Sequence, residues 1–422
     1  MFQEKIYPKL ITGILLLILT CVLGCTNITM QGTDNSIDNT YLFNESRLSA
    51  FGLALQNFPE NERDSVVIDF IQENSTTPII ESDTVASFYW YGKAGKVLMY
   101  CDLFDGWSKQ VLLQAVSCGD SSFFYGSFIL PTDARVDYQF QIDSIFTTDE
   151  RNPTITPSGY GKHSQIAMPG FQPDPVRNIR QDVPNGTFDS IALKSQHSSI
   201  TERKAKIYLP NGYENLNNLP VIYVMDGIEA IEFMSYSVVL DNLIADRKFE
   251  PVIAVFIPPG DRHNEFMGEI SKAFIATLCD EWVKVIDSAY KTNPVPEKRG
   301  ITGISSGGHF ALTAVLKRPD VFLCGAGQSS TITDSMFKVL REFLSEGKNA
   351  PSLRFYFDVG QYDLASGPYK FMSFKEANES FSRELNSSGI THRFSIYNDG
   401  HQWANWRERT DEILTYFFGI ED

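Results

Sequence analysis

The stretch 299–308 constrains the fold more than any other part of this chain. It reads Arg-Gly-Ile-Thr-Gly-Ile-Ser-Ser-Gly-Gly, so a G-x-S-x-G pattern lies between a strand-like run and a helix-like run. Glycines at both ends of the pattern permit a turn so sharp that Ser305 is held on an exposed elbow. The bare pattern recurs by chance in roughly one chain in seven of this length. The prediction therefore depends on its strand–elbow–helix setting.

Strands and helices alternate on both sides of this elbow. Beyond Gly186 the expected strands are 200–208, 219–225, 252–257, 299–303, 321–328, 354–359 and 393–397. The expected helices are 270–290, 307–318, 369–388 and 405–417. The run 219–225 is continuously apolar, as in a sheet buried on both faces. This order predicts a doubly wound, mostly parallel sheet covered by helices, the α/β-hydrolase type of fold.

The first third of the folded chain has a different pattern. A mixed-helical segment over 45–74 precedes short runs rich in Val, Tyr and Phe, separated by turn residues. These runs are 84–91, 96–102, 109–115, 122–130 and 135–142. Such spacing predicts an all-β, immunoglobulin-like sandwich.

Five prolines fall between positions 153 and 175. Because proline breaks helices and cannot donate to a ladder, we expect neither a helix nor a central strand over 152–185. The predicted organisation is a sandwich domain with a leading helix (45–170), a linker (171–190) and a hydrolase domain (191–422).

The first 25 residues indicate a targeting segment. Lys5 and Lys9 precede a 14-residue apolar run, which is short for a membrane-spanning helix. The run ends in Val-Leu-Gly-Cys, which resembles a bacterial lipobox, so Cys25 would carry a lipid. A plain signal peptide or an uncleaved anchor is the alternative. Residues 26–44 would be a polar tether, and the protein would be a membrane-anchored lipoprotein of the bacterial cell envelope.

Charge and cysteine content narrow the function classes. A formal net charge of −16 disfavours nucleic acid as a partner, since phosphate contacts need clustered Lys and Arg. Export would allow disulfides, with Cys101–Cys118 and Cys279–Cys324 as the natural pairs. Their spacing does not resemble a zinc site, and we favour buried free thiols. No metal or organic cofactor is expected.

A serine hydroxyl needs a base within hydrogen-bond reach. Of six histidines, His401 follows the last predicted strand, at the carboxyl edge where a doubly wound sheet collects its reactive groups. His309 lies on the elbow helix, where packing is expected, and His263 could line a pocket.

Asp363 follows the predicted strand 354–359 and would orient the imidazole. Asp358 is the rival, but it lies within the strand and is better suited to burial or capping. The Ser306 N–H would bind a developing oxyanion. The second donor would be the Ile228 N–H, with Gly227 permitting the turn; an ordinary strand-end turn is the alternative.

Three motifs resemble the esterase D family, and within it the enterochelin esterase-like and feruloyl esterase-like proteins. They are Leu-Pro-Val-Ile-Tyr-Val-Met-Asp-Gly at 219–227, the elbow at 303–308, and Gly-His-Gln-Trp-Ala-Asn-Trp-Arg at 400–407. The resemblance covers about 186–418 and implies catalytic roles for Ser305 and His401, with the acid in the loop 360–363.

Two further features of the hydrolase segment concern that resemblance. Arg262 and Glu265 resemble the family's Arg-and-Glu loop, which lines the substrate side. Asp399 is a departure, because a second glycine commonly precedes the histidine.

The sandwich is similar to the early-set domain that precedes enterochelin esterases. The similarity rests on Phe-Asp-Gly-Trp at 104–107, Tyr-Gln-Phe at 138–140 and Asp-Glu-Arg-Asn-Pro at 149–153. Trp107 and Tyr138 could stack on sugars or aromatic substrates, although packing is the commoner role of such side chains.

These observations predict a serine carboxylic-ester hydrolase that acts through an acyl-enzyme. Its substrate would be a catechol siderophore lactone, or a feruloyl or acetyl ester on a polysaccharide. Trp403 and Trp406 would suit an aromatic acyl group or belong to the core. The alternative function is a non-catalytic, glycan- or siderophore-binding envelope lipoprotein on a hydrolase scaffold. The sequence does not indicate an oligomeric state.

Overall fold

The computed structural model describes residues 36–159, 161–346, 353–365 and 372–420. The predicted leader, Cys25 and the first ten residues of the predicted tether lie outside these ranges. In the described part of the chain, no helix combines the length and the apolar composition needed to cross a membrane.

The predicted mostly parallel sheet is confirmed as an eight-stranded sheet in the order β11-β12-β14-β13-β15-β16-β17-β18. The strands are β11 (Thr187–Leu193), β12 (Arg203–Leu209), β13 (Val221–Met225), β14 (Ile253–Ile257), β15 (Arg299–Ile304), β16 (Cys324–Gln328), β17 (Arg354–Tyr362) and β18 (His392–Gly400). β11 and β12 pair antiparallel, and β12 pairs antiparallel with β14; every pairing from β14 to β18 is parallel. β11 was not predicted and begins inside the predicted linker.

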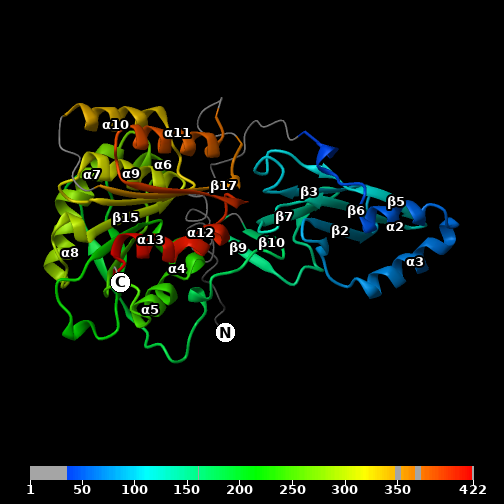
Figure 1. Ribbon diagram of the computed structural model, residues 1–422, viewed down its shortest axis with the longest axis horizontal. Coiled ribbons are helices and arrows are strands. Elements are labelled where there is room, and N and C mark those ends of the chain that lie inside the picture. Colours follow the sequence, from blue (N-terminus) through cyan, green and yellow to red (C-terminus); the bar gives the residue numbers. More distant parts are fainter. Residues whose placement is uncertain (1–35, 160, 347–352, 366–371, 421–422) are drawn as a thin grey trace, which may run out of the picture. The chain divides into compact units, whose positions relative to one another are not determined.

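Helices cover both faces of this sheet (Figure 1). One face carries α7 (Ser271–Thr277), α8 (Val283–Ala289), α9 (Ser306–Lys317), α10 (Asp334–Ser345) and α11 (Phe374–Ser387). The other carries α4 (Gly227–Met234), α5 (Tyr236–Ala245), α12 (Trp403–Trp406) and α13 (Thr410–Phe418). Each set buries its own apolar cluster, so the sheet lies between two cores and its carboxyl edge is left for polar loops.

The N-terminal part contains two antiparallel sheets. The first has the order β1-β2-β6-β5 and the second β4-β3-β7-β10-β9, with β8 pairing to β7. The strands are β1 (Ile79–Ser82), β2 (Val85–Gly92), β3 (Val97–Cys101), β4 (Val111–Leu112), β5 (Gln114–Cys118), β6 (Ser121–Ile129), β7 (Arg135–Ile142), β8 (Ile145–Thr147), β9 (Ile155–Ser158) and β10 (Gly161–Ala167). Side chains of both sheets share one core, which includes Phe88, Phe128, Val136 and Phe140. This packing makes a two-layer sandwich; its immunoglobulin-like topology stays a prediction. Helices α2 (Arg47–Leu55) and α3 (Glu60–Glu73) cover the first sheet.

The prediction that 152–185 holds no central strand is wrong. β10 lies between β7 and β9 and pairs with both. Its seven residues contain no proline, because the prolines of this region fall on either side of it. Pro157 belongs to β9, the edge strand, where a missing N–H costs no ladder bond.

Residues 36–44 of the predicted tether contact the sandwich. Ile37 forms a bridge with Gln110, and the Tyr41 hydroxyl donates to Asp105 Oδ1 at 2.9 Å. The sandwich therefore begins before residue 45. The cysteines of the described residues, at 101, 118, 279 and 324, are buried free thiols, the alternative that the sequence favoured.

Candidate active site

The elbow holds Ser305 in a conformation that few side chains adopt. Its φ is 51° and its ψ is −119°, between the end of β15 and the start of α9. A Cβ added to Gly303 would lie 2.4 Å from the Gly307 carbonyl, so the tight turn excludes a side chain there. The turn is fixed because Ser305 N donates to Gln328 O at 2.9 Å and Thr331 N donates to Ser305 O at 3.0 Å. A strained, well-held backbone of this kind is typical of functional sites.

The structure brings Asp363 and His401 together. β17 and β18 run parallel, and Tyr362 pairs with Gly400, so the residue after each partner leaves the same edge of the sheet. The Nδ1 atom of His401 lies 2.7 Å from Oδ1 of Asp363, and both side chains are buried. Such a contact fixes the imidazole tautomer and leaves Nε2 for proton transfer.

Asp363 stays ionised despite its burial. Burial raises the pKa of this carboxyl, but the His401 charge and hydrogen bonds from His401, Ser329 and the Leu364 amide outweigh it, so the net pKa is lowered. The Leu364 N–H donates to Oδ1 at 2.7 Å. An anion is therefore available to stabilise an imidazolium formed at His401.

Aromatic rings support the imidazole of His401. Trp406 and Phe374 both meet it edge-on, with ring centroids 4.9 Å and 5.1 Å away. The Trp406 Nε1–H donates to Ser329 Oγ at 2.9 Å. Trp403 is also buried and packs against Trp406. The structure thus places Trp403 and Trp406 in the packing around the base, the alternative that the sequence left open, and their role in a substrate pocket stays a prediction.

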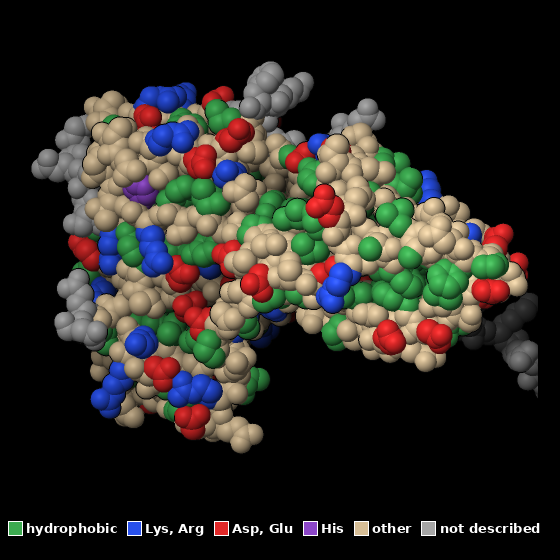
Figure 2. Space-filling view, turned by 45° about the vertical axis from the view of Figure 1, so that its right-hand side comes forward, with side chains coloured by type: hydrophobic (Ala, Val, Ile, Leu, Met, Phe, Trp, Pro, Cys, Tyr) green, Lys and Arg blue, Asp and Glu red, His purple; other side chains and the backbone are tan. Residues whose placement is uncertain are grey.

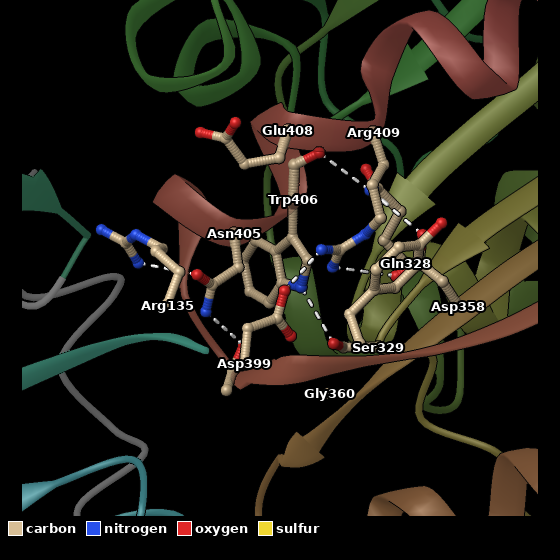
Figure 3. A network of polar contacts seen from close by, with 12 residues as sticks. Arg135, Gln328, Ser329, Asp358, Gly360, Asp399, Asn405, Trp406, Glu408 and Arg409 are labelled. Atoms are coloured by element: carbon tan, nitrogen blue, oxygen red, sulfur yellow. Dashed lines mark hydrogen bonds and ion pairs between the residues drawn. The ribbon is translucent and has the colours of Figure 1, made fainter. Parts of the chain in front are cut away.

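Asp358, the rival acid, belongs to a separate buried ion cluster (Figure 3). Its carboxylate pairs with Arg409 at 3.1 Å and accepts from Gln328 Nε2 at 3.3 Å. Arg409 also binds Asp399, the residue that departs from the family pattern. Burial nevertheless raises the pKa of Asp399 to about 6, because the Arg409 charge only partly offsets it. Asp399 therefore anchors the loop before His401 to the hydrolase core.

Arg262 connects the two turns that would supply oxyanion donors. Its Nε and Nη2 both lie 2.7 Å from the Asp226 carboxylate, and Nη1 donates to Ser306 Oγ at 2.5 Å. Asp226 directly precedes Gly227 and Ile228 at the start of α4. A Cβ on Gly227 would lie 2.4 Å from backbone atoms of the next strand, so only glycine fits. Arg262 therefore fixes the turn of Ile228 against that of Ser306.

The sequence predicted that Glu265 lies on the substrate side, but in the structure its carboxylate is buried. Glu265 is 1% exposed, and its carboxylate accepts from the Arg203 guanidinium and from Gly260 N at 2.8 Å. Both oxygens are engaged within the protein, so the residue holds the loop and does not face a ligand. Arg203 lies 62 positions away, which is why local sequence could not indicate this pair.

The remaining predicted positions have packing roles. His309 is buried and its Nδ1 contacts Thr331 O at 2.8 Å; burial lowers its pKa to about 4. Trp107 is 8% exposed, donates to Asp102 Oδ1 at 2.6 Å and packs on His163. Tyr138 is fully buried. Within the described residues, no cluster of three or more His, Cys, Asp or Glu side chains is arranged to hold a metal.

The sandwich contacts the loops that carry both the acid and the base, which the sequence did not predict. Gly106 has a φ of +58°, and an added Cβ would lie 2.6 Å from the Asp363 carbonyl oxygen. An added Cβ on Gly400 would lie 2.3 Å from the Asp102 carboxyl carbon. The side of the site at β17 and β18 is thus built from both parts of the chain.

On the face in Figure 2, basic and acidic side chains are interspersed.

The family model named Esterase matches residues 197–417, which is just over half of the 422 residues. The chain belongs to the Esterase family. A curated relative, the endo-1,4-beta-xylanase/feruloyl esterase of Xylanibacter ruminicola, is 29% identical over 157 residues, 34% of this chain and 21% of that protein. The uncharacterized protein YbbA of Bacillus subtilis is 23% identical over 29% of this chain and 57% of its own length. The chain thus spans only about a fifth and just over half of these relatives.

Solved structures of enterobactin esterases share the fold of this family member. The Shigella flexneri enzyme has a TM-score of 0.64 at 20% identity, covering 78% of this chain and 92% of that one. The Salmonella typhimurium ferric enterobactin esterase has a TM-score of 0.65 at 18% identity, covering 80% and 95%. The predicted enterochelin esterase-like resemblance is confirmed. Because these shares exceed the hydrolase part alone, the similarity extends into the N-terminal sheets.

Proposed function

We propose that this member of the Esterase family hydrolyses carboxylic esters through an acyl-enzyme on Ser305, with His401 as base and Asp363 as its orienting acid. The 2.7 Å contact between His401 Nδ1 and Asp363 Oδ1, at the carboxyl edge that also carries the strained elbow, is the observation that carries the proposal. A binding protein would have no need of an ionised carboxylate behind a histidine at this edge.

In the proposed reaction His401 Nε2 takes the proton of Ser305 while Oγ attacks the ester carbonyl carbon. The carbonyl oxygen becomes an oxyanion and accepts hydrogen bonds from the amides of Ser306 and Ile228. The C–O bond to the alcohol breaks as that oxygen receives the proton from His401. Water then attacks the acyl-enzyme with His401 again as base, and the carboxylic acid leaves with Ser305 restored.

For the substrate we propose a carboxylic ester whose acyl part carries an aromatic group. Support comes from the names of similar proteins: one curated relative is a feruloyl esterase, and the solved neighbours are enterobactin esterases. A feruloyl ester carries its aromatic group on the acyl side of the scissile bond, whereas a catechol siderophore lactone carries it as an amide on the serine whose ester is cleaved. Acetyl esters of carbohydrates are the smaller alternative.

The test is hydrolysis of p-nitrophenyl acetate and a feruloyl ester by the full chain, beside S305A. Ser387, an exposed residue of α11 whose hydroxyl donates to Glu384 O of the same helix, supplies the matched control S387A. We expect activity in the wild type and S387A and a loss of at least about a thousandfold in S305A. Equal rates in S305A and the wild type would overturn the serine mechanism.

We also propose that the protein is anchored in the bacterial cell envelope by a lipid on Cys25, on the basis of the lipobox-like Val-Leu-Gly-Cys sequence. Cells grown with a labelled fatty acid should incorporate label into the wild type and not into C25S. The matched control is C21S, which removes the other cysteine of the leader. Equal labelling of C25S and the wild type would rule this anchor out.

A further inference from the structure

We infer that Arg135, a residue of the N-terminal sandwich, is a positioning residue for His401 and acts through Asn405 and the Gly400 carbonyl. The inference rests on the proposed function, because it assigns His401 the role of base. It makes the sandwich a working part of the hydrolase site and not only a neighbouring module.

The connection consists of two hydrogen bonds in series, and Figure 3 shows the first of them, from Arg135 to Asn405. Arg135 Nη1 donates to Asn405 Oδ1 at 2.7 Å, across 270 positions of the chain. Asn405 Nδ2 donates to Gly400 O at 2.8 Å, and Gly400 is joined directly to His401. Asn405 is fully buried, so its amide has no water to exchange with and its two contacts are fixed together.

The guanidinium that begins this connection is itself held rigidly. Arg135 is 2% exposed and pairs with the Asp137 carboxylate at 2.8 Å. Its Nε and Nη2 contact Gln165 Oε1 at 3.3 Å and 3.0 Å. Because Arg135 and Asp137 lie on β7 and Gln165 on β10, the donor aimed at Asn405 is positioned by the centre of the second sandwich sheet.

The position of His401, the proposed base, depends on the Gly400 peptide that precedes it. β18 is the edge strand of the large sheet, so among the described residues no further strand pairs with it to fix this peptide. Within the hydrolase part, Asp399 is tied to Arg409 and the Gly400 carbonyl accepts from Asn405; from the sandwich, Asp102 lies against Gly400. A shift of the Gly400 carbonyl would rotate the following backbone and displace the imidazole from its contact with Asp363.

The competing explanation is that Arg135 only holds the two parts of the chain together. A second contact across the same junction separates the two explanations. Asn398 Nδ2 donates to Asp133 Oδ1 at 2.7 Å, and this exposed pair does not reach Gly400. D133A therefore removes an interdomain hydrogen bond without touching the connection to His401.

The decisive variant is N405D. Its carboxylate still accepts from Arg135, so the hydrogen bond between the sandwich and the hydrolase part is kept. The carboxylate cannot donate to the Gly400 carbonyl. R135K keeps a positive charge for Asp137 and loses the fork that also reaches Asn405. In the full chain we expect N405D and R135K to lower kcat by about tenfold or more with KM within about twofold, and D133A to match the wild type. Wild-type kcat in N405D would overturn the inference.

A second readout does not depend on turnover. In full chain carrying ¹⁵N-labelled histidine, the Nδ1–H of His401 that faces Asp363 should give a downfield proton signal, assigned by its absence in H401Q. We expect this signal to shift or broaden in N405D and R135K and to stay in place in D133A. An unchanged signal in both variants would overturn the inference, even if the chain hydrolyses no ester. Thermal unfolding of each variant shows that it is folded, and R135K carries the test should N405D fail to fold.

Discussion

His401 and Asp363 meet because Gly400 and Tyr362, the residues before them, pair on two parallel strands, just after a register shift that follows the Gly360–Tyr397 pair. The 2.7 Å contact between their side chains is thus a property of how β17 and β18 align, and not of a flexible loop. A site built on strand ends is held more closely than one built on loops, which is the condition for general-base catalysis.

Removing the charge of Asp363 should stop catalysis and leave binding intact. In D363N the amide cannot stabilise an imidazolium at His401, so we expect kcat to fall by roughly 10³–10⁴ with little change in KM. Steady-state kinetics on p-nitrophenyl acetate measure both. A fall in KM with an equal fall in kcat would instead indicate that the carboxylate strains the bound ester.

The Asp-to-Asn substitution at Asp358 should instead lower the stability of the protein and leave kcat nearly unchanged. This carboxylate is fully buried and pairs with Arg409, so D358N should lower the free energy of unfolding by about 3 kcal/mol. The kcat of the folded protein should stay within about threefold of the wild type. Urea unfolding and kinetics on the same preparation check this, and a large loss of kcat without loss of stability would make Asp358 the catalytic acid.

A methyl group at Gly106 should disturb the acid from the side of the sandwich. Gly106 and Gly119 both have positive φ, so alanine at either position costs about 1 kcal/mol of backbone strain. An added Cβ meets the Asp363 carbonyl at 2.6 Å only in G106A; at Gly119 it meets nothing within 4 Å. We expect kcat to fall severalfold in G106A and to be unchanged in G119A. Equal kcat values in the two variants would show that this contact does not reach the chemistry.

Replacing Arg262 by lysine tests the pairing of the two oxyanion turns. Lysine keeps the charge but cannot hold Asp226 in a fork while also reaching Ser306. Because both proposed amide donors depend on this clamp, we expect R262K to lower kcat by roughly 10–100-fold. R180K disturbs a surface pair in which Arg180 Nη1 donates to both carboxylate oxygens of Asp246, and should have wild-type kinetics. Wild-type kcat in R262K would mean that the turns are held by their backbones alone.

His309 should make the protein sensitive to acid. Burial lowers its pKa from 6.5 to about 4, so between these values the unfolded chain binds more protons than the folded one. The free energy of unfolding therefore falls as pH falls through this window, by up to about 3 kcal/mol from this group. Urea unfolding at pH 7 and pH 4.5 should show a smaller loss in H309Q than in the wild type. The control H197Q, at an exposed histidine, should lose as much stability as the wild type does.

The positions of Ser305, Asp363 and His401 could be predicted because each lies just beyond a run that the sequence indicates as a strand; β15 and β17 are buried, whereas β18 is a half-exposed edge strand. In a parallel sheet all such ends share one edge, so three separate local patterns converge without knowledge of any long-range contact. The helices were predicted less completely: α9 and α11 agree with predicted helices, whereas α4, α5 and α10 were not predicted.

The partners of buried charges could not be predicted in this way. Glu265 looked like a substrate contact because 262–265 resembles the family's Arg-and-Glu loop, and only the fold brings Arg203 to it. Similarly, no local pattern connects Arg135 with Asn405. β10 was missed since prolines on both sides of it mask a seven-residue strand.

The contacts of residues 36–44 with the rest of the sandwich affect how far the chain can be shortened from its N-terminal side. Lys109 Nζ lies 2.9 Å from Asp38 Oδ2 and 3.0 Å from Asp105 Oδ2, and Tyr41 also binds Asp105. Asp105 precedes Gly106, which touches the Asp363 loop. A chain truncated to begin at residue 45 would keep every named strand yet lose the brace on that turn. The smallest folding unit and the smallest fully active unit of this protein are therefore expected to differ in length.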